Sequence, residues 1–259
     1  MYGAIIGDLA GSIYEYDQVK QVTPVKVNEI IPNNAFYSDD TILTIALLDC
    51  ILNNGNYEEY LKKYINEYKN YQPEFKPYFK FPFSPSTTKW GTTKNVIGTS
   101  KGNGAMMRIS PIGYLFDKEE DVIKNAILAT IPSHNTKEAI DCTKLIALII
   151  FYARKGLTKE KIIQKLNIKY KYEPFIKFNL TCNETINNCL YALFTSNSYE
   201  ESIIKVISYG GDTDTNACIT GSMAEALYGI NEELIVGLKE KLPKQFIKKL
   251  ELGYTKIKK

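Results

Sequence analysis

The stretch SDDTILTIALLDCIL, residues 38–52, largely decides the fold expected for this chain. From Ile42 to Leu52 it is apolar nearly all round, which is typical of a helix in the middle of a core. Its entrance differs, because Asp39 and Asp40 stand side by side directly before the apolar residues. Adjacent like charges repel, and burying an unpaired carboxylate is costly. The stretch therefore predicts a buried helix with a positively charged group bound at its start.

Helical periodicity dominates the rest of the chain as well. Period-2 strand patterns are scarce, and no strict repeat is present. We therefore predict an all-α fold in one domain covering residues 1–259, with the Lys-rich tail 244–259 as a solvated helix end. The further expected helices are 57–68, 119–130, 136–155, 158–166, 182–194, 199–209, 215–228 and 232–241.

Composition and charge exclude several classes of protein. The 32 basic and 29 acidic residues are too evenly balanced for a typical nucleic-acid-binding protein. The longest apolar run, 145–152, is too short to span a bilayer, and no secretory signal pattern is visible. The five cysteines form no CxxC pair, so we expect buried free thiols. We expect a cytoplasmic monomer that binds neither nucleic acid nor membrane.

A second acidic cluster lies near the C-terminus, in YGGDTDTNACITGSMAEALYG, residues 209–229. Two glycines that permit a sharp turn precede Asp212 and Asp214, and a helix rich in small residues follows. Ala217, Gly221 and Ala224 share one face of this helix, which lets a neighbouring helix approach closely. Helix capping alone would explain one such cluster. Two clusters, each with two carboxylates and a hydroxyl before a buried helix, favour a metal site.

The inventory of ligands limits which metal this would be. The chain has one histidine, His134, and no cysteine pair, which excludes a zinc site of the His or Cys type. Carboxylates, hydroxyls and water suit Mg²⁺, Mn²⁺ or Ca²⁺. Four carboxylates would be matched in charge by two divalent cations, so the sequence predicts a binuclear site.

Residues 71–104 interrupt the helical pattern with four prolines and a Ser/Thr/Gly cluster, and we expect a long loop there. Its aromatic side chains would either stack on a ligand or pin the loop to the body of the protein. These are Phe75, Tyr78, Phe79, Phe81, Phe83 and Trp90.

Five segments, in order, resemble the ADP-ribosylglycohydrolase family, which includes dinitrogenase-reductase-activating glycohydrolase and the ADP-ribosyl-acceptor hydrolases. The resemblance covers nearly the whole chain, and five motifs in sequence are far more specific than any one of them. The segments are GAIIGDLAGSIYE (3–15), SDDT (38–41), GNGAMMRISPIGY (102–114), SH (133–134) and GGDTDTNACITGSMAEALYG (210–229).

The resemblance implies an orthogonal helical bundle around a binuclear Mg²⁺ site, with Mn²⁺ as the alternative metal. Glu15, at the end of the opening helix, would be the catalytic carboxylate. The metal ligands would be Ser38, Asp39, Asp40, Asp212, Asp214 and Thr215, with Ser38 in place of the family's commoner threonine. The substrate would contact Ser100, Gly102, Asn103, Gly104, His134 and Tyr209, the last by stacking on adenine. Two further roles come from the residues alone: Asp8 is expected to bond backbone near a turn, and Arg108 to meet either a phosphate or an internal carboxylate.

The implied activity is hydrolysis of the bond at C1″ of ADP-ribose, releasing it from a modified protein side chain or a small adduct. The partner would be ADP-ribose or an ADP-ribosylated protein. Two alternatives stay open: a non-catalytic ADP-ribose-binding protein, and a hydrolase of another nucleotide-sugar N-glycoside. The sequence does not identify the acceptor group.

Overall fold

The computed structural model describes residues 1–73 and 81–257. The predicted loop aromatics Phe75, Tyr78 and Phe79 lie outside the described residues. Within them the fold is all α, with no strand and only isolated bridges, Thr99 with His134 and Gly102 with Thr181. The helices are α1 (Tyr2–Gly11), α2 (Glu15–Lys20), α3 (Asp39–Leu52), α4 (Tyr57–Tyr68), α5 (Pro85–Thr92), α6 (Gly104–Met107), α7 (Ser110–Leu115), α8 (Glu119–Thr130), α9 (Lys137–Arg154), α10 (Lys159–Leu166), α11 (Cys182–Phe194), α12 (Tyr199–Ser208), α13 (Thr213–Tyr228), α14 (Glu232–Lys241) and α15 (Lys244–Lys256).

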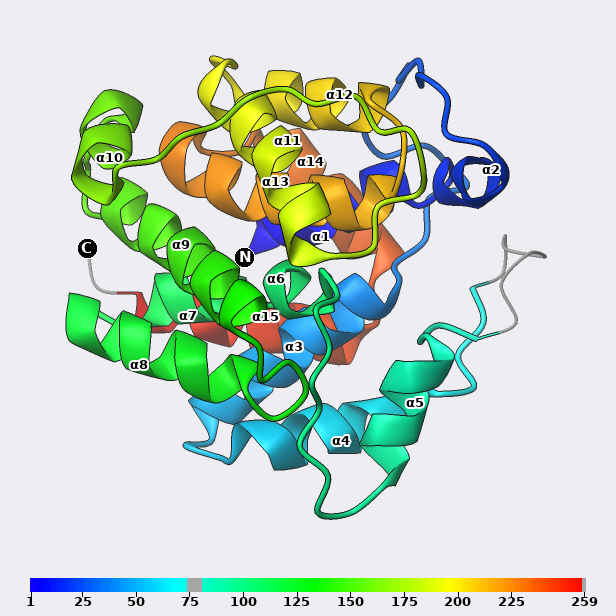
Figure 1. The fold of residues 1–259 in the computed structure, drawn as a ribbon, viewed down its shortest axis with the longest axis vertical. Helices are drawn as coiled ribbons and strands as arrows, with labels where there is room; N and C mark the ends of the chain where they lie inside the picture. The colour runs from blue at the N-terminus through cyan, green and yellow to red at the C-terminus, as the bar shows by residue number, and fades with distance from the viewer. Residues whose placement is uncertain (74–80, 258–259) are drawn as a thin grey trace.

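The N-terminal helix α1 and the late helix α13 pack against each other in the middle of the molecule (Figure 1). Small residues make this close approach possible, as the sequence predicted. A Cβ atom added to Gly7 would lie 2.1 Å from the carbonyl oxygen of Ala217, and one added to Gly221 would lie 2.2 Å from that of Gly3. Both are shorter than any tolerable contact, so the two backbones touch where side chains would otherwise separate them.

Helix α3 is buried from Asp40 to Cys50, as its all-round apolar sequence predicted. Helix α15 packs against it (Figure 1). The prediction that residues 244–259 form only a solvated helix end was wrong for the described part, because α15 is amphipathic. Phe246 and Leu250 on its inner face are 1% and 0% exposed, whereas Lys244 and Lys248 are exposed.

Two helix boundaries differ from expectation in ways that shape the site. The opening helix ends at Gly11 rather than continuing to Glu15, and Ser12 Oγ bonds the Leu9 carbonyl at the break. Glu15 instead begins the short helix α2. Within the predicted loop, Ser84 caps α5 by accepting a hydrogen bond from Thr87 N, with Pro85 in the first turn. Of the loop aromatics, Phe83 and Trp90 are buried in the core, while Phe81 is exposed.

None of the helices in the described ranges is long and apolar enough to cross a membrane. All five cysteines are buried free thiols, as predicted. Residues 167–181 run across the upper part of the view from α10 to α11 (Figure 1).

Candidate active site

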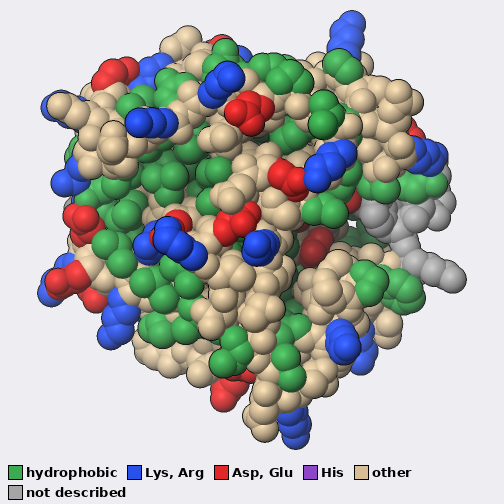
Figure 2. Space-filling model, in the orientation of Figure 1, with side chains coloured by type: hydrophobic (Ala, Val, Ile, Leu, Met, Phe, Trp, Pro, Cys, Tyr) green, Lys and Arg blue, Asp and Glu red, His purple; other side chains and the backbone are tan. Residues whose placement is uncertain are grey.

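A cavity of about 1030 Å³ opens on the molecular surface. Figure 2 shows a hollow next to the grey residues, with acidic atoms inside it. Segments that are far apart in the sequence form its walls. They are the start of α2, the start of α3, α5, residues 100–104 and 178–181, and the start of α13. Helix starts therefore supply most of the polar groups that face this space.

The first acidic pair sits in the first turn of α3, where free N–H groups and the helix dipole favour negative charge. Ser38 is the N-cap, and its hydroxyl accepts a hydrogen bond from Asp40 N at 3.2 Å. The two carboxylates diverge. Asp39 is half-buried and lines the cavity, whereas Asp40 is 1% exposed and turns inward.

The second pair begins α13. Gly210 and Gly211 approach it with φ angles of 72° and 75°, and a Cβ at Gly211 would lie 2.3 Å from the side-chain oxygen of Asn179. That oxygen accepts a hydrogen bond from Asp212 N at 2.8 Å, so the tight turn places Asp212 as the helix cap. Asp214 lies two residues further on, in the first turn of α13, and accepts a hydrogen bond from Thr215 N.

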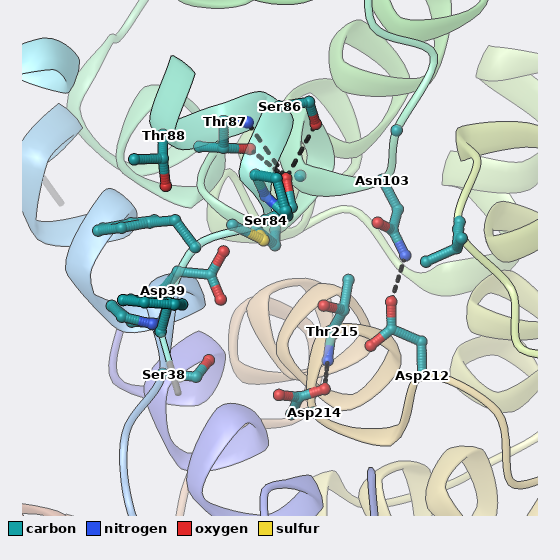
Figure 3. A pocket seen from close by; sticks show the side chains of 18 of the residues that line it. Ser38, Asp39, Ser84, Ser86, Thr87, Thr88, Asn103, Asp212, Asp214 and Thr215 are labelled. Carbon is teal, nitrogen blue, oxygen red and sulfur yellow. Dashed lines mark hydrogen bonds between the residues drawn. The ribbon is translucent and has the colours of Figure 1, made fainter. Parts of the chain in front are cut away.

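The fold brings the two pairs together (Figure 3). Thr215 Oγ1 lies 3.3 Å from an Asp40 oxygen, across 175 positions of sequence. Two groups of carboxylate oxygens each fall within 4.8 Å of one another, and Asp214 belongs to both. One group joins it to Asp8 and Asp40, and the other joins it to Glu15 and Asp212.

Burial and mutual repulsion make these carboxylates hard to ionise in the protein alone. Burial, followed by the charge of Asp214, raises the pKa of Asp8 to about 6. The same two causes raise the pKa of Asp40 well above its usual value. For Asp212 they act in the same order, with Glu15 as a further contributor to its raised pKa. Negative charge at this point therefore calls for a compensating cation.

No lysine or arginine in the described ranges supplies that cation, since no ion pair there involves Asp8, Asp40, Asp212 or Asp214. Asp8 Oδ1 and Asp40 Oδ1 are moreover buried with no hydrogen-bond partner. Buried orphan oxygens are rare in folded proteins. Several carboxylates, two hydroxyls and orphan oxygens form a donor set that fits hard divalent cations such as Mg²⁺ or Mn²⁺.

Asp8 is the residue of this cluster that sequence reasoning did not assign to the site. Its expected role, bonding to backbone, is confirmed: Oδ2 accepts hydrogen bonds from Ser38 N at 2.9 Å and Thr41 N at 3.1 Å. Thr41 Oγ1 donates to the same oxygen. Asp8 therefore fixes the start of α3 with Oδ2, and its carboxylate also lies close to those of Asp40 and Asp214. The signal in the sequence was a lone carboxylate inside the otherwise apolar helix α1.

Another wall of the cavity contains the expected glycine-bearing turn. Ser100, Gly102, Asn103 and Gly104 all line it. Ser100 Oγ accepts a hydrogen bond from Gly102 N at 3.0 Å, which fixes the turn. Asn103 is not simply a loop residue, because its side-chain amide donates to Asp212 at 2.7 Å and ties this wall to the acidic cluster (Figure 3).

His134 also lines the cavity, while Arg108 lies behind it. Arg108 is 2% exposed and does not line the cavity, and no carboxylate in the described ranges forms an ion pair with it, so neither expected role is found there. Its guanidinium donates to the Ala129 carbonyl at 3.3 Å and to Ser133 Oγ at 2.6 Å. Burial, followed by the nearby Arg108 charge, lowers the pKa of His134 well below its usual value.

The structure does not bring Tyr209 to the cavity. Its ring packs against Tyr172, with centroids 4.6 Å apart, and its hydroxyl is buried. Phe178 and Phe81 line the cavity instead.

The polar wall that α5 presents to the cavity was not predicted from the sequence. It includes Ser84, Thr87 and Lys89, of which Figure 3 shows the first two. Its N-cap serine followed by proline was the available signal.

Comparisons with known proteins find a family model, relatives and a shared fold over most of the chain. The family model described as ADP-ribosylglycohydrolase matches residues 1–258. An ADP-ribosylarginine hydrolase, Tri1, of Pseudomonas putida is 23% identical, over 89% of this chain and 70% of the relative. The ADP-ribosylhydrolase ARH3 of Mus musculus is 22% identical, over 89% and 83%. A solved structure titled ADP-ribosylglycohydrolase-related protein complex shares the fold, with a TM-score of 0.68, 20% identity, and coverage of 98% and 91%.

Proposed function

Because the chain belongs to the ADP-ribosylglycohydrolase family, we propose that it hydrolyses the glycosidic bond at C1″ of ADP-ribose in this cavity, with two bound Mg²⁺ ions. The observation that carries the proposal is a cluster of carboxylates beside a cavity large enough for a nucleotide-sized ligand. Glu15, Asp212 and Asp214 line that cavity, and Asp214 also meets the buried carboxylates of Asp8 and Asp40. Ligand cavities commonly measure about 300–1,000 Å³.

Ser38, Asp39, Asp40, Asp212, Asp214 and Thr215 are the proposed ligands of the metal pair, with Asp8 behind them. Bound divalent ions would offset the carboxylate charge and orient the hydroxyls of the ribose next to the scissile bond. The chain's own contribution is rigidity. Asp8 holds the start of α3, Asn103 holds Asp212, and Thr215 joins the two helix starts.

Glu15 is the proposed catalytic residue. It lines the cavity and is half-buried, so it has access both to the carboxylate cluster and to water. Bond cleavage at C1″ develops oxocarbenium character, which a nearby carboxylate stabilises. Glu15 would take a proton from the water that attacks this carbon. Its position at the start of α2, after the break at Ser12, separates it from the rigid helix α1.

The test is a release assay. The purified protein is incubated with arginine-linked, serine-linked and O-acetyl-linked ADP-ribose in Mg²⁺, and free ADP-ribose is measured. We expect release from at least one of these substrates, its loss in EDTA, and its recovery with added Mg²⁺ or Mn²⁺. Tight binding of ADP-ribose without release from any substrate would instead indicate a binding protein, and the linkage that is cleaved identifies the acceptor.

A further inference from the structure

A buried arginine, a serine and the chain's single histidine form a hydrogen-bonded chain that ends at the cavity. Arg108 is 2% exposed, and no carboxylate in the described ranges pairs with its guanidinium. Its pKa is lowered by burial, to about 10, so the group is still charged at neutral pH. A charged guanidinium can only donate, and one of its N–H groups is directed at Ser133 Oγ, 2.6 Å away.

The Ser133 oxygen therefore accepts from Arg108, and the Ser133 hydroxyl proton still needs an acceptor. It is 5% exposed, and its only other recorded partner among the described residues is His134 Nδ1, at 2.7 Å. If Nδ1 carried the ring proton, it would donate to Ser133 Oγ, and the buried hydroxyl proton would have no acceptor. If Nδ1 is the acceptor, the Ser133 hydroxyl proton is used and the ring proton lies on Nε2, at the cavity, where water or a ligand can accept it. Arg108 Nε has no partner in the described ranges in either arrangement, so it does not distinguish them. The second arrangement is favoured because unsatisfied buried donors are costly.

The other ring nitrogen of His134 then carries the proton, and it faces the glycine-bearing turn. A Cβ at Gly102 would lie 3.6 Å from Nε2, and one at Gly104 would lie 3.8 Å from it. The two glycines thus leave the space beside Nε2 open to a ligand in the cavity. No residue in the described ranges accepts a hydrogen bond from Nε2.

We propose that Ser133, oriented by Arg108, is a positioning residue that holds His134 as the Nε2–H tautomer, so that His134 donates to an anionic phosphate oxygen of the ligand. An uncompensated buried cation lies directly behind this donor, and Lys101 lines the cavity nearby. Both favour a negatively charged acceptor over a neutral one. Only the identity of the ligand rests on the proposed function, because the tautomer is a property of the free protein.

The first experiment reads the tautomer directly. With one histidine in 259 residues, a protein labelled with [¹⁵N]histidine gives one pair of ring nitrogen signals that need no assignment. Two-bond ¹H–¹⁵N correlations at neutral pH should show a protonated Nε2 and an unprotonated Nδ1, without a second form. A protonated Nδ1 in the free protein would overturn the proposal.

Variants then test the positioning residues. Ser133→Ala should give a measurable mixture of the two tautomers, and Ser133→Thr, which keeps the hydroxyl, should restore the single form. Arg108→Leu should change the ratio in the same direction as Ser133→Ala. Ser222→Ala is the matched control, since Ser222 is a similarly buried serine whose hydroxyl donates to the Ile219 carbonyl. A single Nε2–H form that persists in Ser133→Ala would contradict the assignment.

Binding supplies the functional readout. Ser133→Ala should raise the Kd for ADP-ribose about tenfold, as expected for a weakened hydrogen bond to a charged group, with Ser133→Thr and Ser222→Ala close to the unmodified protein. ADP-ribose should shift the Nε2 signal, and adenosine, which lacks phosphate, should not. An equal shift with adenosine would overturn the phosphate assignment. If no ADP-ribose binds at all, the proposed function fails while the tautomer result still stands.

Discussion

At the scale of single residues, Glu15 differs from the other carboxylates of the site. Asp8, Asp40, Asp212 and Asp214 are buried in or beside rigid helices, whereas Glu15 is half-buried on the short helix α2. Glu15→Gln should therefore lower the rate of ADP-ribose release by about 100-fold or more, the usual range for losing an acid–base group. The melting temperature should stay close to that of the unmodified protein.

The check is a parallel measurement of release rate, ADP-ribose affinity and thermal unfolding. Asp17→Asn is a suitable control, because Asp17 lies on the same helix and is exposed. Glu15→Gln with full activity would exclude Glu15 as the catalytic residue.

Asp8 should prove important for stability as well as for the site. Asp8→Ala removes the acceptor of Ser38 N, Thr41 N and Thr41 Oγ1, and should lower the free energy of unfolding by about 3 kcal/mol. Asp8→Asn keeps an acceptor oxygen and removes a charge from the repelling cluster, so it should cost much less in metal-free protein. Urea unfolding in EDTA compares them, and equal losses in the two variants would show that the hydrogen bonds are not the cause.

The residues of the acidic pairs could be predicted because their patterns are local in sequence. Each pair stands directly before an apolar helix, where paired carboxylates are unusual; the pairs are Asp39 with Asp40 and Asp212 with Asp214. The carboxylate of Asp8 could not be placed in the same way, since its partners lie 30 and 33 positions away. Arg108 was misjudged for a related reason: nothing local shows that its partners would be a carbonyl and a serine rather than an anion.

At the scale of elements, the contact between α1 and α13 depends on having no side chain at Gly7. Gly7→Ala would place a Cβ 2.1 Å from Ala217 O and 2.4 Å from Ala217 C, both backbone atoms that cannot move aside easily. We expect a loss of about 1–3 kcal/mol in the free energy of unfolding.

Gly237→Ala, in α14, is the matched control for this prediction. There a Cβ would meet only Ile31 Cδ1, at 3.4 Å, and alanine is the better helix former by about 1 kcal/mol. Chemical denaturation should show that Gly7→Ala is destabilised and that Gly237→Ala is unchanged or slightly stabilised. Similar stability in the two variants would contradict the close packing described for α1 and α13.

The helices with strong apolar periodicity could be predicted closely, and those defined by capping or by tertiary contact could not. Helix α9 (137–154) falls within the expected 136–155, and α11 agrees with its expected range. Helix α5 is short and polar and depends on its Ser84 cap, so its proline-rich surroundings predicted a loop. The break at Ser12 depends on a side-chain bond to the preceding turn, which periodicity does not reveal.

At the scale of the whole molecule, stability should depend on pH and metal together. The folded-state pKa of Asp8 is about 6, against an ordinary value of 3.8, and Asp40 and Asp212 are shifted in the same direction. The folded protein therefore binds more protons than the unfolded chain between about pH 4 and pH 6. Metal-free protein should become more stable as the pH falls from about 7 to about 5, by roughly 1–1.5 kcal/mol for Asp8 alone.

Saturating Mg²⁺ should remove this dependence, because the cation takes the place of the protons and stabilises the protein at pH 7. Urea unfolding at pH 5, 6 and 7, in EDTA and in Mg²⁺, measures both effects. If metal-free protein instead loses stability as the pH falls through this range, the pKa values of these carboxylates are not raised in the folded protein.

The distance in sequence between the two acidic helix starts has a consequence for synthesis on the ribosome. Asp40 and Thr215 are 175 positions apart, and α1 finds its partner α13 only after that later helix has been made. A nascent chain thus carries its first carboxylate pair, with nothing to complete an ion site, through most of translation. Any product truncated before residue 212 would lack half of the set, so metal uptake would report that the chain has been made past residue 215 and that its two acidic helix starts have come together.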